Sequence, residues 1–158
     1  MEKHFTIIKK TRENFLKLIE GLTIEELNSI PENFNNNIIW NLGHLIRSQQ
    51  VLCYILGNET PKVDEDIVLK YGKGTKPEAF IDENELKFLK ENLVSNIESL
   101  EQDYNNGLFK NFTSYTTSYG IELNTIEDAI KFIVCHEGLH FGYSMSLKRL
   151  VTQCNTVV

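Results

Sequence analysis

The stretch that decides the fold is AIKFIVCHEGLHFGYSMSLKRL, residues 129–150. Its core-facing positions recur at steps of three and four, which predicts a long helix with one side turned to the interior. That stripe comprises Ala129, Ile133, His136, His140, Tyr143, Leu147 and Leu150. Two histidines therefore stand in the middle of a core-facing helix face. Residues four apart lie on the same face, so the two imidazoles can converge on one point.

Three further segments carry a helical pattern. They cover residues 3–20, residues 37–56, and the stretch that begins at Asp82 and ends near Tyr104. The second of these is apolar around most of its circumference, which predicts a helix buried on several sides. Strand signal is weak throughout the chain. The sequence therefore predicts an all-α fold, a four-helix bundle, with residues 1–158 forming a single domain.

Two long connections separate these helices. Residues 57–81 contain glycines, prolines and charges, with room for a turn or two of helix, and residues 105–122 have room for a short strand. A 20-residue helix is about 30 Å long, and the first connection can extend well beyond that. It is therefore long enough to cross the bundle and start the third long helix parallel to the second. Side chains suited to a helix N-cap stand at Thr23, Asp82 and Thr125, and the run Asn35-Asn36-Asn37 leads into the helix of residues 37–56.

The composition argues against several classes of protein. The net charge is −6 and no basic patch stands out, so nucleic acid and acidic membrane surfaces are poor partners. No apolar segment of about 18 residues occurs, so we expect no membrane span. The three cysteines, Cys53, Cys135 and Cys154, form no C-x-x-C motif, and their odd number fits a reducing cytoplasm.

Residues 136–140 fit the H-E-x-x-H motif of zinc proteases letter for letter. A protease of that type needs a third ligand, commonly downstream, and a sheet beside the helix. The chain after His140 contains no Asp, Glu or His, and the all-α pattern offers no such sheet. A third metal ligand must therefore come from upstream. A histidine pair at this spacing also arises by chance, and a core histidine is usually only hydrogen-bonded, so a site without metal stays open.

His44 is the candidate for that third ligand. It lies inside the predicted helix of residues 37–56, on an arc that includes Asn41 and Ser48, two small polar groups able to support a buried ligand. Gly43 beside it permits the close approach of another backbone or a ligand. Taken alone, His44 would be an ordinary core histidine. His4, at the start of the first helix, is expected to be solvated.

Two short motifs carry a resemblance to a known family, WNLGHL at residues 40–45 and HxxxHxG at residues 136–142. Together they resemble the DinB-like superfamily, which includes YfiT-type metal-dependent hydrolases and bacterial thiol S-transferases. The resemblance covers nearly the whole chain. It implies a bundle of up-down-down-up order with a long crossover between helices two and three. It also implies a divalent metal held by three histidines: His44, His136 and His140. Members often carry Gln where this chain has Tyr143, so substrate handling there is expected to differ.

Three histidine ligands leave a coordination position for water or substrate. A metal so held can activate water or a thiol, which predicts an enzyme for hydrolysis or S-transfer on a small molecule. Zinc is the first choice; nickel, iron, copper and manganese are alternatives, and a low-molecular-weight thiol is a candidate cofactor. A non-catalytic metal- or ligand-binding bundle and a plain bundle without metal are the competing interpretations. A homodimer is compatible with each of them.

Four neighbours of the histidines have two interpretations each. Glu137 is a candidate general base, but its position about 100° around the helix from the first paired histidine also lets it face solvent or another helix. Tyr143 lies one turn beyond the second and either donates a hydrogen bond to a ligand or packs. Arg47 either binds an anionic substrate group or is a surface arginine with a packed stem. Cys135 is expected to be buried and inert.

Overall fold

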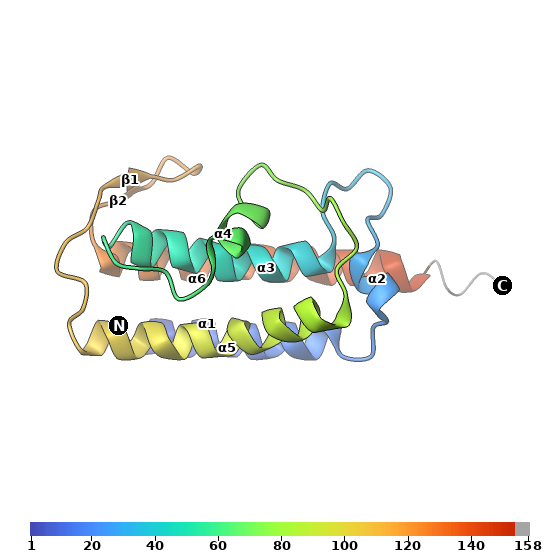
Figure 1. Ribbon diagram of the computed structural model, residues 1–158, viewed down its shortest axis with the longest axis horizontal. Helices are drawn as coiled ribbons and strands as arrows, with labels where there is room; N and C mark the ends of the chain where they lie inside the picture. The colour runs from blue at the N-terminus through green and yellow to red at the C-terminus, as the bar shows by residue number, and fades with distance from the viewer. Residues whose placement is uncertain (154–158) are drawn as a thin grey trace.

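Helices dominate this computed structural model, which describes residues 1–153 (Figure 1). The elements, in chain order, are α1 (Glu2–Ile19), α2 (Ile24–Asn28), α3 (Ile38–Gln49), the π-helical segment η1 (Gln50–Ile55), α4 (Glu65–Lys70), α5 (Glu83–Asn105), β1 (Tyr115–Thr116), β2 (Glu122–Leu123) and α6 (Ile126–Gln153). The prediction of an all-α protein is confirmed for these residues. Cys154, one of the three cysteines, lies outside the described residues.

The helices begin where the sequence places capping residues. Backbone N–H groups of the first turn donate to a capping side chain in α2, α3, α5 and at the start of α6. The accepting residues are Thr23, Asn37, Asp82 and Thr125. In α2 the cap is reciprocal, because the Glu26 carboxylate accepts from the Thr23 N–H at 2.9 Å. These bonds satisfy N–H groups that the helix itself leaves without partners.

The four long helices run lengthwise beside one another, and each contacts two of the others (Figure 1). The first, α1, contacts α5 and α6, and α3 contacts the same two helices. The connection of residues 57–81 leaves the end of η1 and passes back along α3, so that α5 begins near the end where α3 begins. Within it, the predicted helical turns are present as α4. The predicted short strand is also present, since β1 and β2 pair antiparallel with Tyr115 opposite Leu123.

The core surrounds α3. Within that helix every residue except Arg47 is buried, as expected for a segment that is apolar around its circumference. Helix α3 is covered by α5 and α6 on its inner side and touches α4 on its outer side. The hairpin β1–β2 lies on the side of α3 and α6 that faces away from α1 and α5 (Figure 1), whereas α4 also reaches α5, since its Lys70 pairs with Glu85. None of the described helices combines the length and the apolarity needed to cross a membrane.

Candidate metal centre

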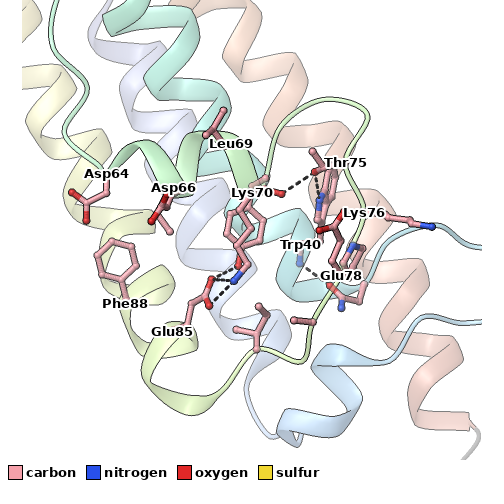
Figure 2. A pocket seen from close by; sticks show the side chains of 16 residues that line it. Trp40, Asp64, Asp66, Leu69, Lys70, Thr75, Lys76, Glu78, Glu85 and Phe88 are labelled. Carbon is pink, nitrogen blue, oxygen red and sulfur yellow. Dashed lines mark hydrogen bonds and ion pairs between the residues drawn. The ribbon is translucent and has the colours of Figure 1, made fainter.

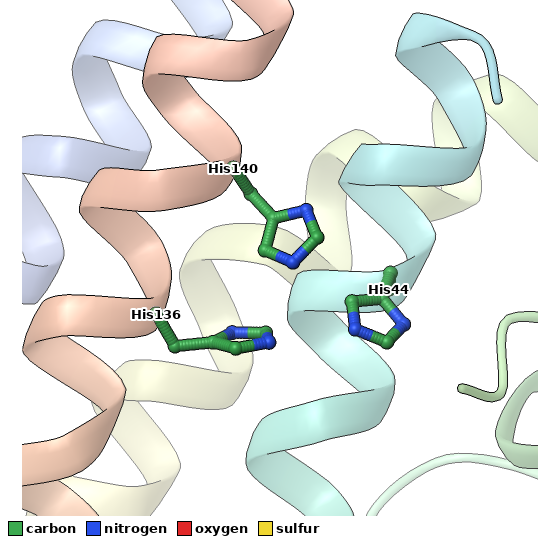
Figure 3. A group of neighbouring side chains, drawn as sticks. All are labelled: His44, His136 and His140. Atoms are coloured by element: carbon green, nitrogen blue, oxygen red, sulfur yellow. The ribbon is translucent and has the colours of Figure 1, made fainter. Parts of the chain in front are cut away.

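Three imidazoles meet between α3 and α6 (Figure 3). His44 comes from α3, and His136 and His140 come from successive turns of α6. The ring centroids are 4.5 Å apart within the α6 pair, and that of His44 lies 5.2 Å from His136 and 4.7 Å from His140. One nitrogen of each ring can be chosen so that the three atoms all lie within 4.8 Å of one another. The structure therefore brings together the three histidines that the sequence singled out, and they could hold a metal ion.

Hydrogen bonds fix the orientation of two of the rings. The carbonyl oxygen of Tyr71 lies 2.7 Å from Nδ1 of His44, and Oδ1 of Asn41 lies 2.8 Å from Nδ1 of His140. Both partners are acceptors, so each Nδ1 donates a proton and each Nε2 keeps its lone pair. This is the arrangement that metal-binding histidines usually have, with the second nitrogen held by a carbonyl or amide oxygen. The hydroxyl of Ser48 lies 3.3 Å from Nε2 of His44.

The surroundings keep the imidazoles neutral. Burial, with the charges of neighbouring histidines and arginines, lowers the pKa of His136 to about 3. Burial and the charge of His44 lower the pKa of His140 to about 4. Burial also lowers the pKa of His44 itself. At neutral pH all three rings therefore carry lone pairs, as a metal ligand requires.

The distances fit a divalent cation. A zinc–nitrogen bond is about 2.1 Å, so two ligand atoms on one ion are at most about 4.2 Å apart. The nitrogens lie within 4.8 Å of one another, close to that span. The residues present therefore fit a cation held by three neutral imidazoles.

Tight packing behind His44 holds its ring in place. The indole of Trp40 stacks on it at a centroid distance of 4.6 Å and an interplanar angle of 12°. Beside it, a Cβ atom on Gly43 would lie 2.5 Å from the ring of Tyr71. No such contact is tolerated, so glycine at 43 is what allows the Tyr71 ring and its carbonyl to reach α3. The close approach expected at Gly43 is thus made by a side chain of the crossing connection.

A comparison with protein families agrees with the site. The model of the DinB superfamily matches residues 7–144, a span that contains all three histidines. The chain belongs to the DinB superfamily. No curated protein shows a significant match to it.

Glu137 in this DinB-superfamily protein faces the interior of the helix bundle. Its side chain is 1% exposed, so the interpretation as a solvated carboxylate is wrong. The Arg12 guanidinium donates to Oε1 from Nε at 2.9 Å and from Nη2 at 2.7 Å. Oε2 is buried without a hydrogen-bond partner. Burial raises the pKa of the carboxyl, and the charge of Arg12 opposes that rise.

Arg12 is the functional neighbour that the sequence interpretation missed. It is fully buried, and its Nη1 also donates to Oε1 of Gln49 at 2.8 Å and to the carbonyl of Leu93 at 2.7 Å. This one side chain thus links α1 to α3, α5 and α6. The signal was available, because Arg12 stands four residues after Ile8 and three before Phe15, on the buried stripe of α1.

The remaining candidates are distributed around the centre. The ring of Tyr143 packs 5.6 Å from that of Phe34, and within residues 1–153 its hydroxyl has no hydrogen-bond partner. Arg47 is partly buried. The expectation that Cys135 is buried is wrong, because it lies on the exposed outer face of α6 beside Gly138 and Leu139.

A cavity of about 900 Å³ lies next to the centre, on the outer side of α3 (Figure 2). Trp40 and Tyr71 line it, and both also contact His44. Its polar groups include Lys70, which pairs with Glu85 at 2.7 Å. None of the three histidines lines this cavity, so it borders the histidine cluster of this DinB-superfamily protein without containing it.

Proposed function

We propose that this protein is a metal-dependent enzyme of the DinB type, acting on a small molecule. His44, His136 and His140 hold one divalent cation, with zinc the first choice and nickel, iron or manganese as alternatives. The observation that carries the proposal is the convergence of three neutral imidazoles from two helices, within 4.8 Å. Two of them are already held in the tautomer in which Nε2 carries the lone pair.

The ligand set indicates the kind of chemistry. A divalent cation with three protein ligands keeps a position open and supplies a Lewis acid that activates water or a thiol at neutral pH. Trp40 covers one side of the His44 ring and excludes water from it. The Tyr143 hydroxyl, one turn from His140, is free to donate a hydrogen bond to a substrate. Hydrolysis and S-transfer with a low-molecular-weight thiol both suit this arrangement.

Glu137 has a predicted role as general base. Its surroundings also support a second role, in which it positions the turn of α6 that carries His136. The ion pair with Arg12 anchors the turn of α6 that carries His136. Glu137→Gln separates the two roles. Loss of a base removes one limb of the pH–rate profile. Loss of an anchor lowers the melting temperature and leaves the shape of that profile unchanged.

Metal analysis of untagged protein, followed by His44→Ala, tests the proposal. We expect about one divalent cation per chain, lost in the variant, and metal-dependent turnover in a panel of hydrolysis and thiol-transfer substrates. His4→Ala, which removes an imidazole at the start of α1, is the matched control and should keep both. Metal-loaded protein that turns over nothing in either panel would argue strongly against an enzyme.

A second candidate function is a non-catalytic ligand-binding bundle. The cavity of about 900 Å³ beside Trp40 and Tyr71 favours it, because small-molecule sites have volumes of this order. In that case His44→Ala lowers the melting temperature of metal-loaded protein, whereas no substrate is consumed. Ligand binding would instead respond to a substitution in the cavity, such as Phe88→Ala.

The remaining predictions concern architecture and context. Helix adjacency and the returning connection of residues 57–81 support an up-down-down-up four-helix bundle. A cytoplasmic location and a homodimer stay predictions. Sedimentation of the purified protein checks the second of them.

A further inference from the structure

Arg47 is the one residue of α3 that is not buried. It stands three residues after His44, close to the same face of the helix. Its Nε donates to the carbonyl of Val68 in α4 at 3.3 Å, a long bond and the one hydrogen bond of this side chain within residues 1–153. No carboxylate in that part of the chain forms an ion pair with it. Arg12 differs in this respect, because Nε, Nη1 and Nη2 of its guanidinium all donate hydrogen bonds inside the bundle.

The guanidinium lies on α3 one turn beyond His44, where it meets the connection that crosses the bundle. It touches α4 through Val68, and it is close enough to Tyr115 of β1 for the two groups to interact electrostatically. Arg47 therefore lies on the helix that carries His44, beside α4 and within electrostatic reach of the hairpin.

A partly buried cation in this position lacks a counter-charge. Burial lowers the pKa of the Arg47 guanidinium, which reports that its charge is less well solvated than at the surface. A divalent cation on the imidazoles would add a second positive charge nearby. An oxyanion placed between the guanidinium and the cation would offset both the poor solvation of the Arg47 charge and the repulsion between the two positive charges. A guanidinium also has the planar fork of N–H donors that matches a carboxylate or another oxyanion.

We propose that Arg47 forms an oxyanion subsite, which binds a carboxylate-type group of the substrate while another atom of the same molecule takes the open position at the cation. The substrate class is then a small organic acid with a metal-seeking atom, such as a thiol sulfur, a few bonds from the acidic group. This inference rests on the proposed metal site and adds the substrate chemistry to it.

Cobalt-substituted protein tests the subsite without any turnover. Binding of a thiol to the cobalt is followed by its sulfur-to-metal charge-transfer absorption. The probes are 3-mercaptopropionate, its neutral analogue 3-mercaptopropionamide, and 2-mercaptoethanesulfonate as a tetrahedral oxyanion. We expect the wild type to bind the carboxylate about tenfold or more tightly than the amide, as for a charge-assisted contact. The sulfonate shows whether the subsite favours a planar group.

Substitutions at Arg47 test whether this side chain causes the preference. In Arg47→Gln the preference for the oxyanions should disappear, while the dissociation constant of the amide changes by less than about twofold. Arg47→Lys, which keeps the charge and loses the fork, should retain part of the preference. Comparing the carboxylate-to-amide ratio between variants cancels the difference in acidity between the two thiols. Arg149→Gln removes one positive charge from an exposed position nine residues beyond His140 and should leave the ratio unchanged.

Three results would overturn the inference. If Arg47→Gln keeps the wild-type preference, or if the wild type shows none, Arg47 is no oxyanion subsite, although the metal site stands. If the protein binds no cobalt, the proposed function fails and the subsite fails with it.

Discussion

The carbonyl oxygen of Tyr71 lies 2.7 Å from Nδ1 of His44. Tyr71 caps the C-terminus of α4, inside the long connection that crosses the bundle, whereas His44 is in the middle of the buried helix α3. The connection therefore does more than join two helices. It selects the tautomer of a candidate metal ligand, and its Tyr71 ring fills the space that Gly43 leaves open.

Gly43→Ala should disrupt this arrangement. The new Cβ would lie 2.5 Å from the Tyr71 ring, so either the ring or α3 must move. We expect a loss of about 1–3 kcal/mol in the free energy of unfolding, as for overpacking a core. Metal affinity should also fall, because Tyr71 carries the carbonyl that orients His44. Urea unfolding of metal-free protein and calorimetric metal titration measure the two effects.

Gly142→Ala is the matched control for that change. Gly142 is exposed in α6, and a Cβ there meets nothing within 4 Å. Alanine is the better helix former, so this variant should be neutral or more stable by up to about 1 kcal/mol. Equal effects of the two substitutions would mean that the Tyr71 contact does not constrain Gly43.

Asn41→Leu should weaken metal binding through His140. The Asn41 side chain accepts from Nδ1 of His140 and donates to the carbonyl of Asn37 at 2.8 Å. Loss of the partner that orients a ligating histidine typically costs about 10- to 100-fold in metal affinity. Asn41→Asp keeps an acceptor and should retain most of the affinity. Calorimetric titration with zinc compares the three proteins.

The control for Asn41 lies in α5. Asn92 also donates to the carbonyl four residues earlier, that of Phe88, at 2.9 Å, but touches no histidine. Asn92→Leu therefore removes the same kind of helix bond without affecting the centre. If it lowers zinc affinity as much as Asn41→Leu, the effect is one of folding and not of ligand orientation.

The histidine site could be predicted from the sequence because it depends on the spacing of residues within single helices. Spacing within one helix places His136 and His140 on a common face, and a buried apolar helix around His44 makes that histidine their natural partner. The contacts of Arg12 and Tyr71 are between segments far apart in the chain, which periodicity does not report. Cys135 was misplaced because the expectation rested on the usual burial of free cysteines, whereas its position on α6 turns it outward.

Breaking the Arg12–Glu137 pair should be costly. Both side chains are buried, so Arg12→Met leaves a carboxylate in the core without its partner. We expect a loss of about 3–5 kcal/mol, and the double variant Arg12→Met/Glu137→Leu should recover much of it. By contrast, Lys10→Ala removes an exposed pair with Glu13 and should cost less than about 1 kcal/mol. A double-mutant cycle by urea unfolding yields the coupling; a value below about 1 kcal/mol would show that the buried pair adds little.

The stability of the metal-free protein should fall as the pH drops below about 6.5. Folding lowers the pKa of His136 to about 3 and that of His140 to about 4, whereas an unfolded histidine titrates near 6.5. Between these values the unfolded chain binds protons that the folded chain does not, so acid favours unfolding. Each such imidazole contributes about 1.4 kcal/mol per pH unit in this interval.

The variant His136→Asn isolates one of these protons. Carboxylates also titrate in the acid range, but they contribute equally to both proteins. Between pH 6 and pH 4.5 the variant should therefore take up about one proton fewer on unfolding than the wild type, so its unfolding free energy depends less steeply on pH. Above pH 7.5 the two slopes should coincide. Parallel slopes in the acid range would mean that the His136 imidazole is as accessible to protons in the folded protein as in the unfolded chain. That result would contradict the partly buried, neutral imidazole on which the proposed metal centre depends.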